Sequence, residues 1–407
     1  MGLLEGRWGR RALFTALYAS EGAPIGYVWW ALPTKLKAAG LPIEDVTALT
    51  ALVTVPWALK FLWAPLIDTL RGPRWGLRAW IVASQLLMGL MLVPLVLADD
   101  PFRPEGLGLL TLLLVAHAVF ASTQDVSIDA LAITTVPPEE RGTINGFMQL
   151  GMLGARAAFG GIALYVEQFV GERVVLVALL ACIWLSSLLV IFGLREPLRR
   201  EGSAGGFVSK LRAMLKASST WWAVAFALVA GAGFKATGAV AGPLLLSSGL
   251  DKEGVGLFFS TTAAALALGA LGGGKLADLR GRHEAARLLL LGLAVAVGIT
   301  AAASLLGGAV LVAALLALYV VAGAFTAAEL ALYMDATDPA LGATQFSAYM
   351  GAINLCETWS SYSVGQLVPV TGYPSALSAM AVISLLGVVL LPRMVAASSE
   401  RLAPAEG

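Results

Sequence analysis

The stretch ASTQDVSIDAL, from Ala121 to Leu131, lies inside a long apolar run that extends from Leu107 to Ile133. It carries two carboxylates, Asp125 and Asp129, which share one face of a helix because they are four residues apart. A charged side chain in membrane hydrocarbon costs about 2.5–3.5 kcal/mol on insertion scales, so it faces a cavity or a partner. Two interpretations are open: the carboxylates neutralise nearby cations and hold helices together, or they take part in moving a solute across the membrane.

The composition predicts an integral membrane protein. Of the 407 residues, 58% are hydrophobic and 13% are charged, whereas soluble proteins carry about 25% charged residues. The net charge of +1 gives no indication of a nucleic-acid partner. Cys182 and Cys356 both lie in apolar runs, so neither a disulfide framework nor a metal site is expected, and no cofactor is predicted. The N-terminal GRWGRR precedes a long apolar helix without a small-residue cleavage site, which predicts a retained first helix.

A helix needs about 20 apolar residues to cross a bilayer. Twelve such runs can be placed in this sequence, and they predict an all-α membrane protein with twelve transmembrane helices. Their approximate bounds are 12–38, 44–67, 78–98, 107–133, 142–167, 173–194, 220–248, 253–277, 286–304, 309–335, 342–368 and 373–392.

The longest polar stretch, 195–219, falls in the middle of the chain and reads as a flexible linker. It predicts an N-terminal six-helix bundle over 1–194 and a C-terminal six-helix bundle with a short tail over 220–407. Lysine and arginine are unevenly distributed between the loops on the two sides, with 18 on one side and 5, Lys35 among them, on the other, out of 27 in the chain. The positive-inside rule therefore places the linker and both termini in the cytoplasm.

The two halves repeat. The segment WWALPTKLKAAGLPIEDV aligns with AVAGPLLLSSGLDKEGV, so that Pro33 matches Pro243 and Gly40 matches Gly249. The offsets are 210 (243 − 33) and 209 (249 − 40). Parallel repeats of six helices build the transporters of the major facilitator fold, whose substrate site lies near the midplane between the halves.

The polar loops after the second and eighth runs also repeat, with Asp68 and Asp278 again 210 residues apart. The second loop, GGGKLADLRGR, resembles the signature loop of the major facilitator superfamily. An aspartate at a helix end beside arginines can form charge-assisted hydrogen bonds that latch one conformation, and the alternative is a plain positive-inside loop. The predicted gating residues are Asp68, Arg71, Asp278 and Arg282.

Charged residues recur inside the predicted membrane helices. At about 1.5 Å per residue, Glu21, Arg156, Lys235 and Glu357 fall near mid-membrane, and the others fall nearer the cytoplasm: Lys60, Asp125, Asp129 and Glu329. The five acids outnumber the three bases, and an unpaired buried carboxylate can carry a proton. The candidates for proton coupling are therefore Asp125, Asp129, Glu21, Glu329 and Glu357. Loop cations or water can also satisfy the surplus acids.

Arg156 and Lys235 belong to opposite halves and lie at the depth expected of a substrate site, so we expect them to bind an anionic solute. Permanent structural pairs, Arg156 with Glu21 and Lys235 with Glu357, are the alternative. Further substrate-binding candidates are polar or aromatic: Lys60, Gln124, Trp29, Trp30 and Trp359. The tryptophans near helix ends can instead be interfacial anchors.

Glycines predict close helix packing in two parts of the chain, the fifth apolar run and the stretch 269–275. In the fifth run the glycines form the pairs Gly160-Gly161 and Gly151-x-x-Gly154. The stretch 269–275, GALGGGK, satisfies part of a phosphate-binding P-loop pattern, but Leu276 stands where serine or threonine is required, and the stretch ends a membrane helix. ATP binding is therefore not expected there.

Four segments carry a family resemblance: KFLWAPLID (60–68), STQDVSIDA (122–130), ERGTINGFMQLGML (140–153) and GATQFSAYMGAINL (342–355). They resemble the AmpG-type muropeptide permeases of the peptide/acetyl-coenzyme A transporter group, within the major facilitator superfamily. The resemblance covers roughly residues 12 to 375. It implies a proton-driven importer in the bacterial inner membrane with a small-molecule substrate. Siderophore permeases of the rhizobactin and pyochelin type are similar to this group.

We therefore predict a proton-coupled secondary transporter, acting as a monomer in the bilayer, that imports a polar and anionic, muropeptide-like solute. Siderophore permease and acetyl-coenzyme A-type transporter are alternatives, and a transporter-like sensor or scaffold is a non-transport alternative. An enzyme is not expected. An intramembrane aspartyl protease would need two facing carboxylates from different helices, whereas Asp125 and Asp129 share one helix.

Overall fold

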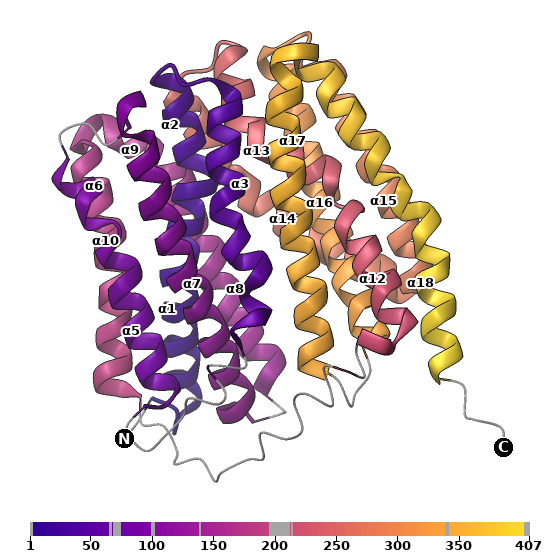
Figure 1. Cartoon of the computed structure of the whole chain (residues 1–407), viewed down its shortest axis with the longest axis horizontal. Helices are drawn as coiled ribbons and strands as arrows, with labels where there is room; N and C mark the ends of the chain where they lie inside the picture. The colour runs from indigo at the N-terminus through magenta and orange to yellow at the C-terminus, as the bar shows by residue number, and fades with distance from the viewer. Residues whose placement is uncertain are drawn as a thin grey trace. The chain divides into compact units, whose positions relative to one another are not determined.

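The computed structural model describes residues 3–64, 67, 75–98, 102–137, 140–194, 212, 215–337 and 342–402. These residues are helical almost throughout, and no β-strand occurs among them (Figure 1). The predicted apolar runs form helices close to the expected bounds. The run 107–133 forms α7 (Leu107–Thr135), and the run 309–335 forms α16 (Gly308–Ala336). The prediction of an all-α membrane protein is confirmed.

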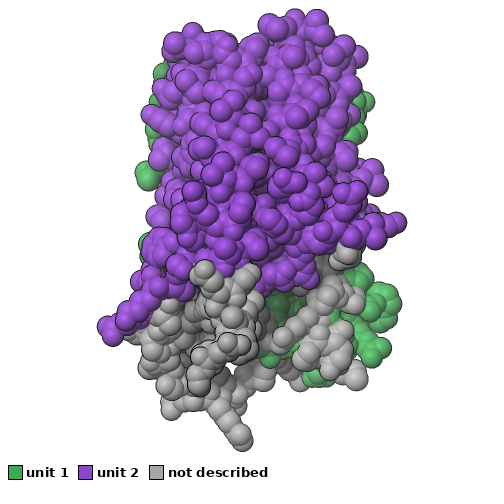
Figure 2. Space-filling view, turned by 90° about the vertical axis from the view of Figure 1, so that its right-hand side faces the viewer, with its two compact units in different colours: residues 1–41, 62–203, 251–263 green, residues 42–61, 204–250, 264–407 purple. Residues whose placement is uncertain are grey.

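The chain divides into two compact units (Figure 2). The first unit, green in the figure, consists of residues 1–41, 62–203 and 251–263. The second unit, in purple, consists of residues 42–61, 204–250 and 264–407. The first unit contains α1 (Arg7–Gly26), η1 (Tyr27–Ala31), α2 (Leu32–Ala38), α5 (Leu77–Leu90), α6 (Val93–Leu97), η3 (Pro104–Gly106), α7, α8 (Arg141–Ala157), η5 (Ala158–Ile162), α9 (Ala163–Val170), α10 (Glu172–Gly193) and the N-terminal part of α14 (Lys252–Arg280). The second unit contains α3 (Ile43–Leu59), α12 (Ser218–Val229), α13 (Ala232–Ser247), the remainder of α14, α15 (Arg282–Ala303), α16, α17 (Gly342–Ser384) and α18 (Leu386–Leu402). The short turn η2 (Lys60–Leu62) lies where the chain passes from the second unit to the first.

Each unit therefore draws one segment from the other half of the chain: residues 42–61 pack with the second unit and residues 251–263 with the first. The division into 1–194, 195–219 and 220–407 describes the order of the chain and stays a prediction. Residues 195–211 of the linker lie outside the described residues.

Ten helical stretches of the described chain are long and apolar enough to cross a membrane. The last of them, Gln345–Ala397, has 53 residues, about 80 Å of helix at ~1.5 Å per residue, which is more than one crossing needs. Within it, Gly372 has a φ of 75° and breaks the helix direction. The expected number of twelve spans stays a prediction.

The repeat between the halves is visible in two helix ends. Gly40 and Gly249 have φ values of 92° and 93°. At the first end Leu41 N–H donates to the Leu36 carbonyl at 3.1 Å, and the matching bond from Leu250 to the Leu245 carbonyl is also 3.1 Å. A glycine with positive φ followed by this bond is a Schellman cap, so the aligned glycines have the same structural role.

Glycines bring α1 and α8 into backbone contact in the first unit. A Cβ atom at Gly22 would collide with the backbone of Met152, and one at Gly151 would collide with the carbonyl oxygen of Thr15. The predicted close packing is thus confirmed at Gly151. It is wrong at Gly154, where an added Cβ meets no atom within 4 Å.

The second unit uses the same device between α14 and α16. A Cβ at Gly269 would collide with the Val320 backbone, and one at Gly273 would collide with the Ala324 backbone. The packing role expected for the glycines of the 269–275 stretch is confirmed at these two positions, whereas Gly272 and Gly274 face open space.

An ion pair joins the start of α1 to the start of α8. The Arg10 guanidinium donates to Glu140 through Nε at 2.9 Å and Nη2 at 2.8 Å, and Arg7 Nε adds a bond to the same carboxylate at 3.2 Å. These hydrogen bonds with Arg10, together with the neighbouring charges, hold the pKa of the Glu140 carboxyl below its ordinary value of 4.5.

The glycine contact predicts opposite effects for two substitutions on α8. Gly151→Ala forces α1 and α8 apart, and overpacking of this kind destabilises by about 1–3 kcal/mol. Gly154→Ala is the matched control, since it adds a methyl group to open space and improves helix propensity by about 0.8–1.0 kcal/mol. Thermal unfolding of both purified variants measures the difference, and equal midpoints would contradict the packing account.

The Glu140 ion pair predicts a pH-dependent contribution to stability. A carboxyl with a depressed folded pKa stabilises the fold above its unfolded pKa, and this contribution disappears as the pH falls through the folded value. Glu140→Gln should therefore lower the melting temperature at neutral pH, and the difference from the parent should close below about pH 4.5. In an Arg10→Gln background, Glu140→Gln should lower the melting temperature at neutral pH much less than it does in the parent. If the decrease is the same in both backgrounds, the stabilisation by Glu140 does not depend on Arg10.

Candidate functional site

The two aspartates of α7 lie in different environments. Asp125 is buried, with 6% of its surface exposed, whereas Asp129 is exposed and accepts a hydrogen bond from the Tyr18 hydroxyl of α1 at 2.7 Å. Asp125 and the buried Glu21 are also close enough to Tyr18 to interact with it electrostatically. Three of the predicted proton-coupling carboxylates thus gather around one tyrosine, which the sequence did not single out because a tyrosine in an apolar run resembles a packing residue.

Gln124 lies in a buried polar network. Its amide nitrogen donates to Ser20 Oγ at 3.0 Å, and Gln85 Nε2 donates to the same hydroxyl at 3.1 Å and to Ser186 Oγ at 2.7 Å. Ser187 closes the network with a bond to Gln85 Oε1 at 2.8 Å. Gln124 is fully buried and links α7 to α1, so the described geometry gives it a packing role, and a substrate contact stays a prediction.

Arg156 lies on an aromatic stack in the first unit. Its guanidinium carbon is 5.0 Å from the ring centroid of Trp30 in η1, and that ring stacks on Phe259 of α14 at 5.4 Å with an interplanar angle of 10°. Trp30 and Phe259 are buried, and Arg156 is half-buried. Trp29, the other predicted aromatic residue of this segment, is also half-buried.

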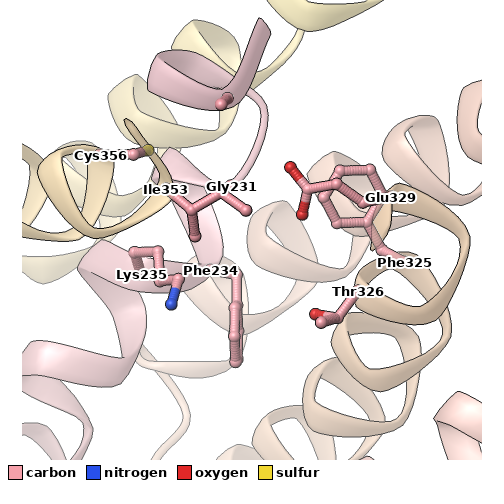
Figure 3. Close-up of a pocket in the computed structure, with 9 residues that line it drawn as sticks. Gly231, Phe234, Lys235, Phe325, Thr326, Glu329, Ile353 and Cys356 are labelled. Carbon is pink, nitrogen blue, oxygen red and sulfur yellow. The ribbon is translucent and has the colours of Figure 1, made fainter. Parts of the chain in front are cut away.

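The second unit contains a small cavity of about 20 Å³, enough for one water molecule. Its walls come from α12, α13, α16 and α17, and they carry Phe234, Lys235, Phe325, Glu329 and Cys356 among others. Figure 3 shows the Lys235 ammonium and the Glu329 carboxylate on different helices around this space.

Both charged groups of the cavity have partners. Lys235 Nζ donates to Glu357 Oε2 at 2.6 Å, which realises the pair expected from their common depth. Glu329 is 5% exposed and accepts a bond from the Tyr333 hydroxyl at 2.9 Å. Tyr333 in turn stacks on Tyr349 with ring centroids 5.2 Å apart. Neither tyrosine was predicted.

Two other predicted substrate contacts, Trp359 and Lys60, have partners within the second unit. Trp359 Nε1 donates to the Leu228 carbonyl at 2.8 Å, which ties α17 to α12. Lys60 Nζ lies 5.6 Å from the Trp57 ring centroid.

Lys35 is placed differently from the expectation. It was counted among the cations of the outer loops, but it lies in α2 with 4% of its surface exposed. It pairs with Glu167 and Glu172, while the Tyr27 hydroxyl donates to Glu172 at 2.5 Å. The Lys35 ammonium also lies 5.3 Å from the Phe102 ring centroid. Counting it as a loop cation was wrong, because α2 continues to Ala38 and turns this side chain toward α9 and α10.

The predicted gating residues are only partly described. Asp68, Arg71 and the side chain of Asp278 lie outside the described residues. Arg282 pairs with Asp335 near the end of α16, and its Nη1 also donates to the Ala331 carbonyl at 3.4 Å. Sequence reasoning missed Asp335, whose position gave no signal because it lies 53 residues from Arg282.

Comparisons with known proteins agree with this architecture. A family model for the Major Facilitator Superfamily matches residues 12–365. The chain is 26% identical over 248 residues to the Rickettsia felis protein designated AmpG 4, covering 57% of this chain and 58% of that protein. It is 29% identical over 164 residues to the anhydromuropeptide permease of Escherichia coli, covering 39% of this chain and 31% of that protein. The aligned part thus spans between about a third and somewhat more than half of these relatives.

Solved structures extend the likeness in fold to nearly the whole chain. A bacterial homologue of the human lysosomal transporter Spinster, in an inward-facing and unoccupied conformation, superposes with a TM-score of 0.68 at 16% identity, covering 97% of this chain and 98% of that chain. The nucleoside transporter NupG superposes with a TM-score of 0.72 at 11% identity, covering 97% and 99%. Together with the family model over residues 12–365, these matches mean that the chain belongs to the Major Facilitator Superfamily of membrane transporters.

Proposed function

We propose that this transporter imports a polar, anionic solute of muropeptide-like chemistry and that the proton gradient drives the import. The observation that carries the proposal is the ion pair of Lys235 with the half-buried Glu357, because Lys235 also lines a small cavity together with the buried acid Glu329. Arg156 is the corresponding cation of the first unit. The AmpG-type relatives support the muropeptide-like class of solute.

The pair gives a route for coupling. A carboxylate bonded to an ammonium at 2.6 Å is stabilised in its charged form. An anion that binds Lys235 competes with Glu357, and a carboxylate that loses its cation in a low-dielectric site gains affinity for a proton. Binding of the solute and uptake of a proton then favour each other. Asp125, Asp129, Glu21 and Glu329 are the other candidates for the proton-carrying group.

The proposal includes a topology of twelve helices. The ten spans become twelve when the stretch Gln345–Ala397 is counted as two helices that meet at Gly372 and when α1, η1 and α2 together count as one. The excess of loop cations on one side supports cytoplasmic termini, and Lys35 no longer contributes to the opposite side. We place the protein in the bacterial inner membrane and expect it to act as a monomer.

A ligand screen tests the class of solute. A ligand that binds only the folded state at 100 times its Kd stabilises that state by about 2.7 kcal/mol. The purified chain should show a concentration-dependent rise in melting temperature with 1,6-anhydro-muropeptides. Ferric siderophores, acetyl-coenzyme A and small neutral peptides form the comparison arms. A rise with a ferric siderophore alone would replace the muropeptide assignment by the siderophore alternative.

The proton-coupling proposal predicts the response of uptake in proteoliposomes. An inward proton gradient should drive accumulation of the solute found in the screen, and an uncoupler should abolish it. Asp125→Asn and Asp129→Asn should lower net uptake by about tenfold, which corresponds to ~1.4 kcal/mol. Thr123→Ala is the control on α7, because its hydroxyl bonds only the Val119 carbonyl of its own helix in the described structure. Uptake that persists at full rate with the uncoupler would exclude proton coupling.

The anion site predicts a loss of affinity when either cation is removed. Arg156→Ala and Lys235→Ala should each weaken binding of the solute at least about tenfold, ~1.4 kcal/mol, because a cation in a low-dielectric site attracts an anion strongly. Arg393→Ala is the control: this arginine of α18 is not a predicted substrate contact, and its guanidinium lies 5.4 Å from the ring centroid of Trp222 on α12. Calorimetric titration of folded variants is the measurement. Unaltered affinity in both would leave the two cations as parts of permanent structural pairs.

A further inference from the structure

Arg156, Trp30 and Phe259 form one continuous stack within the first unit. The guanidinium carbon lies 5.0 Å from the Trp30 ring centroid, and the Trp30 and Phe259 rings are nearly parallel, 10° apart, with centroids at 5.4 Å. A guanidinium on an aromatic face is attracted by the ring quadrupole and keeps its plane. The two rings are 5% and 1% exposed, whereas Arg156 is half-buried. Arg156 is therefore the most exposed member of the stack.

The backbone around the stack is unusual in two places. Trp30 lies in the π-helical turn η1, and Arg156 lies in the last turn of α8, two residues before the π-helical turn η5. π-Helical turns are rare and occur frequently at functional sites. The two π-helical turns, η1 and η5, also contact each other.

Two successive glycines of η5 make the room that the stack needs. A Cβ at Gly160 would come within 2.8 Å of the Trp30 ring, and a Cβ at Gly161 would collide with Ser260 of α14, one residue after Phe259. Gly160 therefore leaves room for the Trp30 ring, and Gly161 leaves room for α14, the helix that carries Phe259.

We propose that the stack is the part of the substrate site in the first unit that binds a carboxylate of the solute, and that Trp30 is a positioning residue that fixes the plane of Arg156. A guanidinium fork with a fixed plane binds a carboxylate through two parallel hydrogen bonds. One guanidinium neutralises one negative charge, which fits a monoanionic carboxylate better than a doubly charged phosphate. The inference rests on the proposed transport of an anionic solute and names the group that this unit recognises.

The direct test follows the Trp30 ring by fluorine NMR. The full-length chain is labelled with 5-fluorotryptophan, and the Trp30 signal is identified by its absence in Trp30→Phe. The probes are lactate, methyl lactate and inorganic phosphate, together with an anhydro-muropeptide. Lactate and the muropeptide should shift the Trp30 signal saturably, and methyl lactate should leave it in place. No response to lactate and muropeptide, or an equal response to the ester, would overturn the inference.

Variants separate positioning from simple packing. Trp30→Leu and Gly160→Ala should both weaken carboxylate binding about tenfold, because one removes the ring and the other displaces it. Trp30→Phe retains a ring face and should restore most of the affinity. Arg156→Lys keeps the charge but not the planar fork, so it should weaken lactate binding about tenfold, whereas a contact that depends on charge alone would be kept. Trp221→Leu on α12 is the control with an exposed tryptophan.

The outcomes distinguish this inference from the proposed function. If the muropeptide is not transported but lactate still shifts the Trp30 signal, the carboxylate site stands and the proposed solute is wrong. If the muropeptide is transported while Trp30→Leu, Gly160→Ala and Arg156→Lys keep the parent's affinity and selectivity, the proposed function stands and the positioning role is wrong. A loss of melting temperature without any change in Kd would also assign the stack to packing alone.

Discussion

The fold depends on one constraint: a charge inside hydrocarbon must be held by another side chain. The two units meet this constraint in different ways. In the second unit, Lys235 is bonded directly to Glu357 at 2.6 Å. In the first, the Arg156 guanidinium lies over the face of the Trp30 ring, which attracts a cation through its quadrupole. The two units thus hold these two cations with different partners, a carboxylate in one and an aromatic ring in the other.

Close backbone contact makes both arrangements possible. Side chains reach across helices only when the helices approach each other, and glycine permits the closest approach. Gly22 and Gly151 bring α1 against α8, and Gly160 leaves space for the Trp30 ring. In the second unit, Gly269 and Gly273 have the same role between α14 and α16. The glycines therefore allow close contact between helices in both units, although they carry no chemistry themselves.

Sequence periodicity and length predicted the helices, because an apolar run of about 20 residues has one stable form in a bilayer. The matching of Gly40 with Gly249 predicted a repeat between the halves, and the structure gives both positions the same helix cap bond. Partners were harder to predict. The pair of Lys235 and Glu357 could be expected from depth alone, but the role of Tyr18 could not, since it depends on which faces of two helices meet.

Lys35 shows the limit of reasoning from charge and position. A lysine near the end of an apolar run is ordinarily a loop cation, and nothing in the local sequence identifies its partners. Glu167 and Glu172 follow it by more than a hundred residues and lie next to it only because α9 and α10 return to the same end of the unit. Such clusters are determined by tertiary packing, so no local pattern reveals them.

The tyrosines that hold the acids differ in a way that bears on coupling. Tyr333 and Glu329 are one turn apart on α16, so their bond keeps its length when the helix moves as a body. Tyr18 and Asp129 belong to α1 and α7, and their bond at 2.7 Å depends on how these helices are placed. A shift between two packed helices of 1–2 Å, as occurs in allosteric transitions, is enough to break such a bond. A carboxylate held from its own helix has a constant environment, whereas one held across helices changes its environment with the conformation. Within the proposed proton coupling, Asp129 is therefore the better candidate than Glu329 for the group that carries the proton.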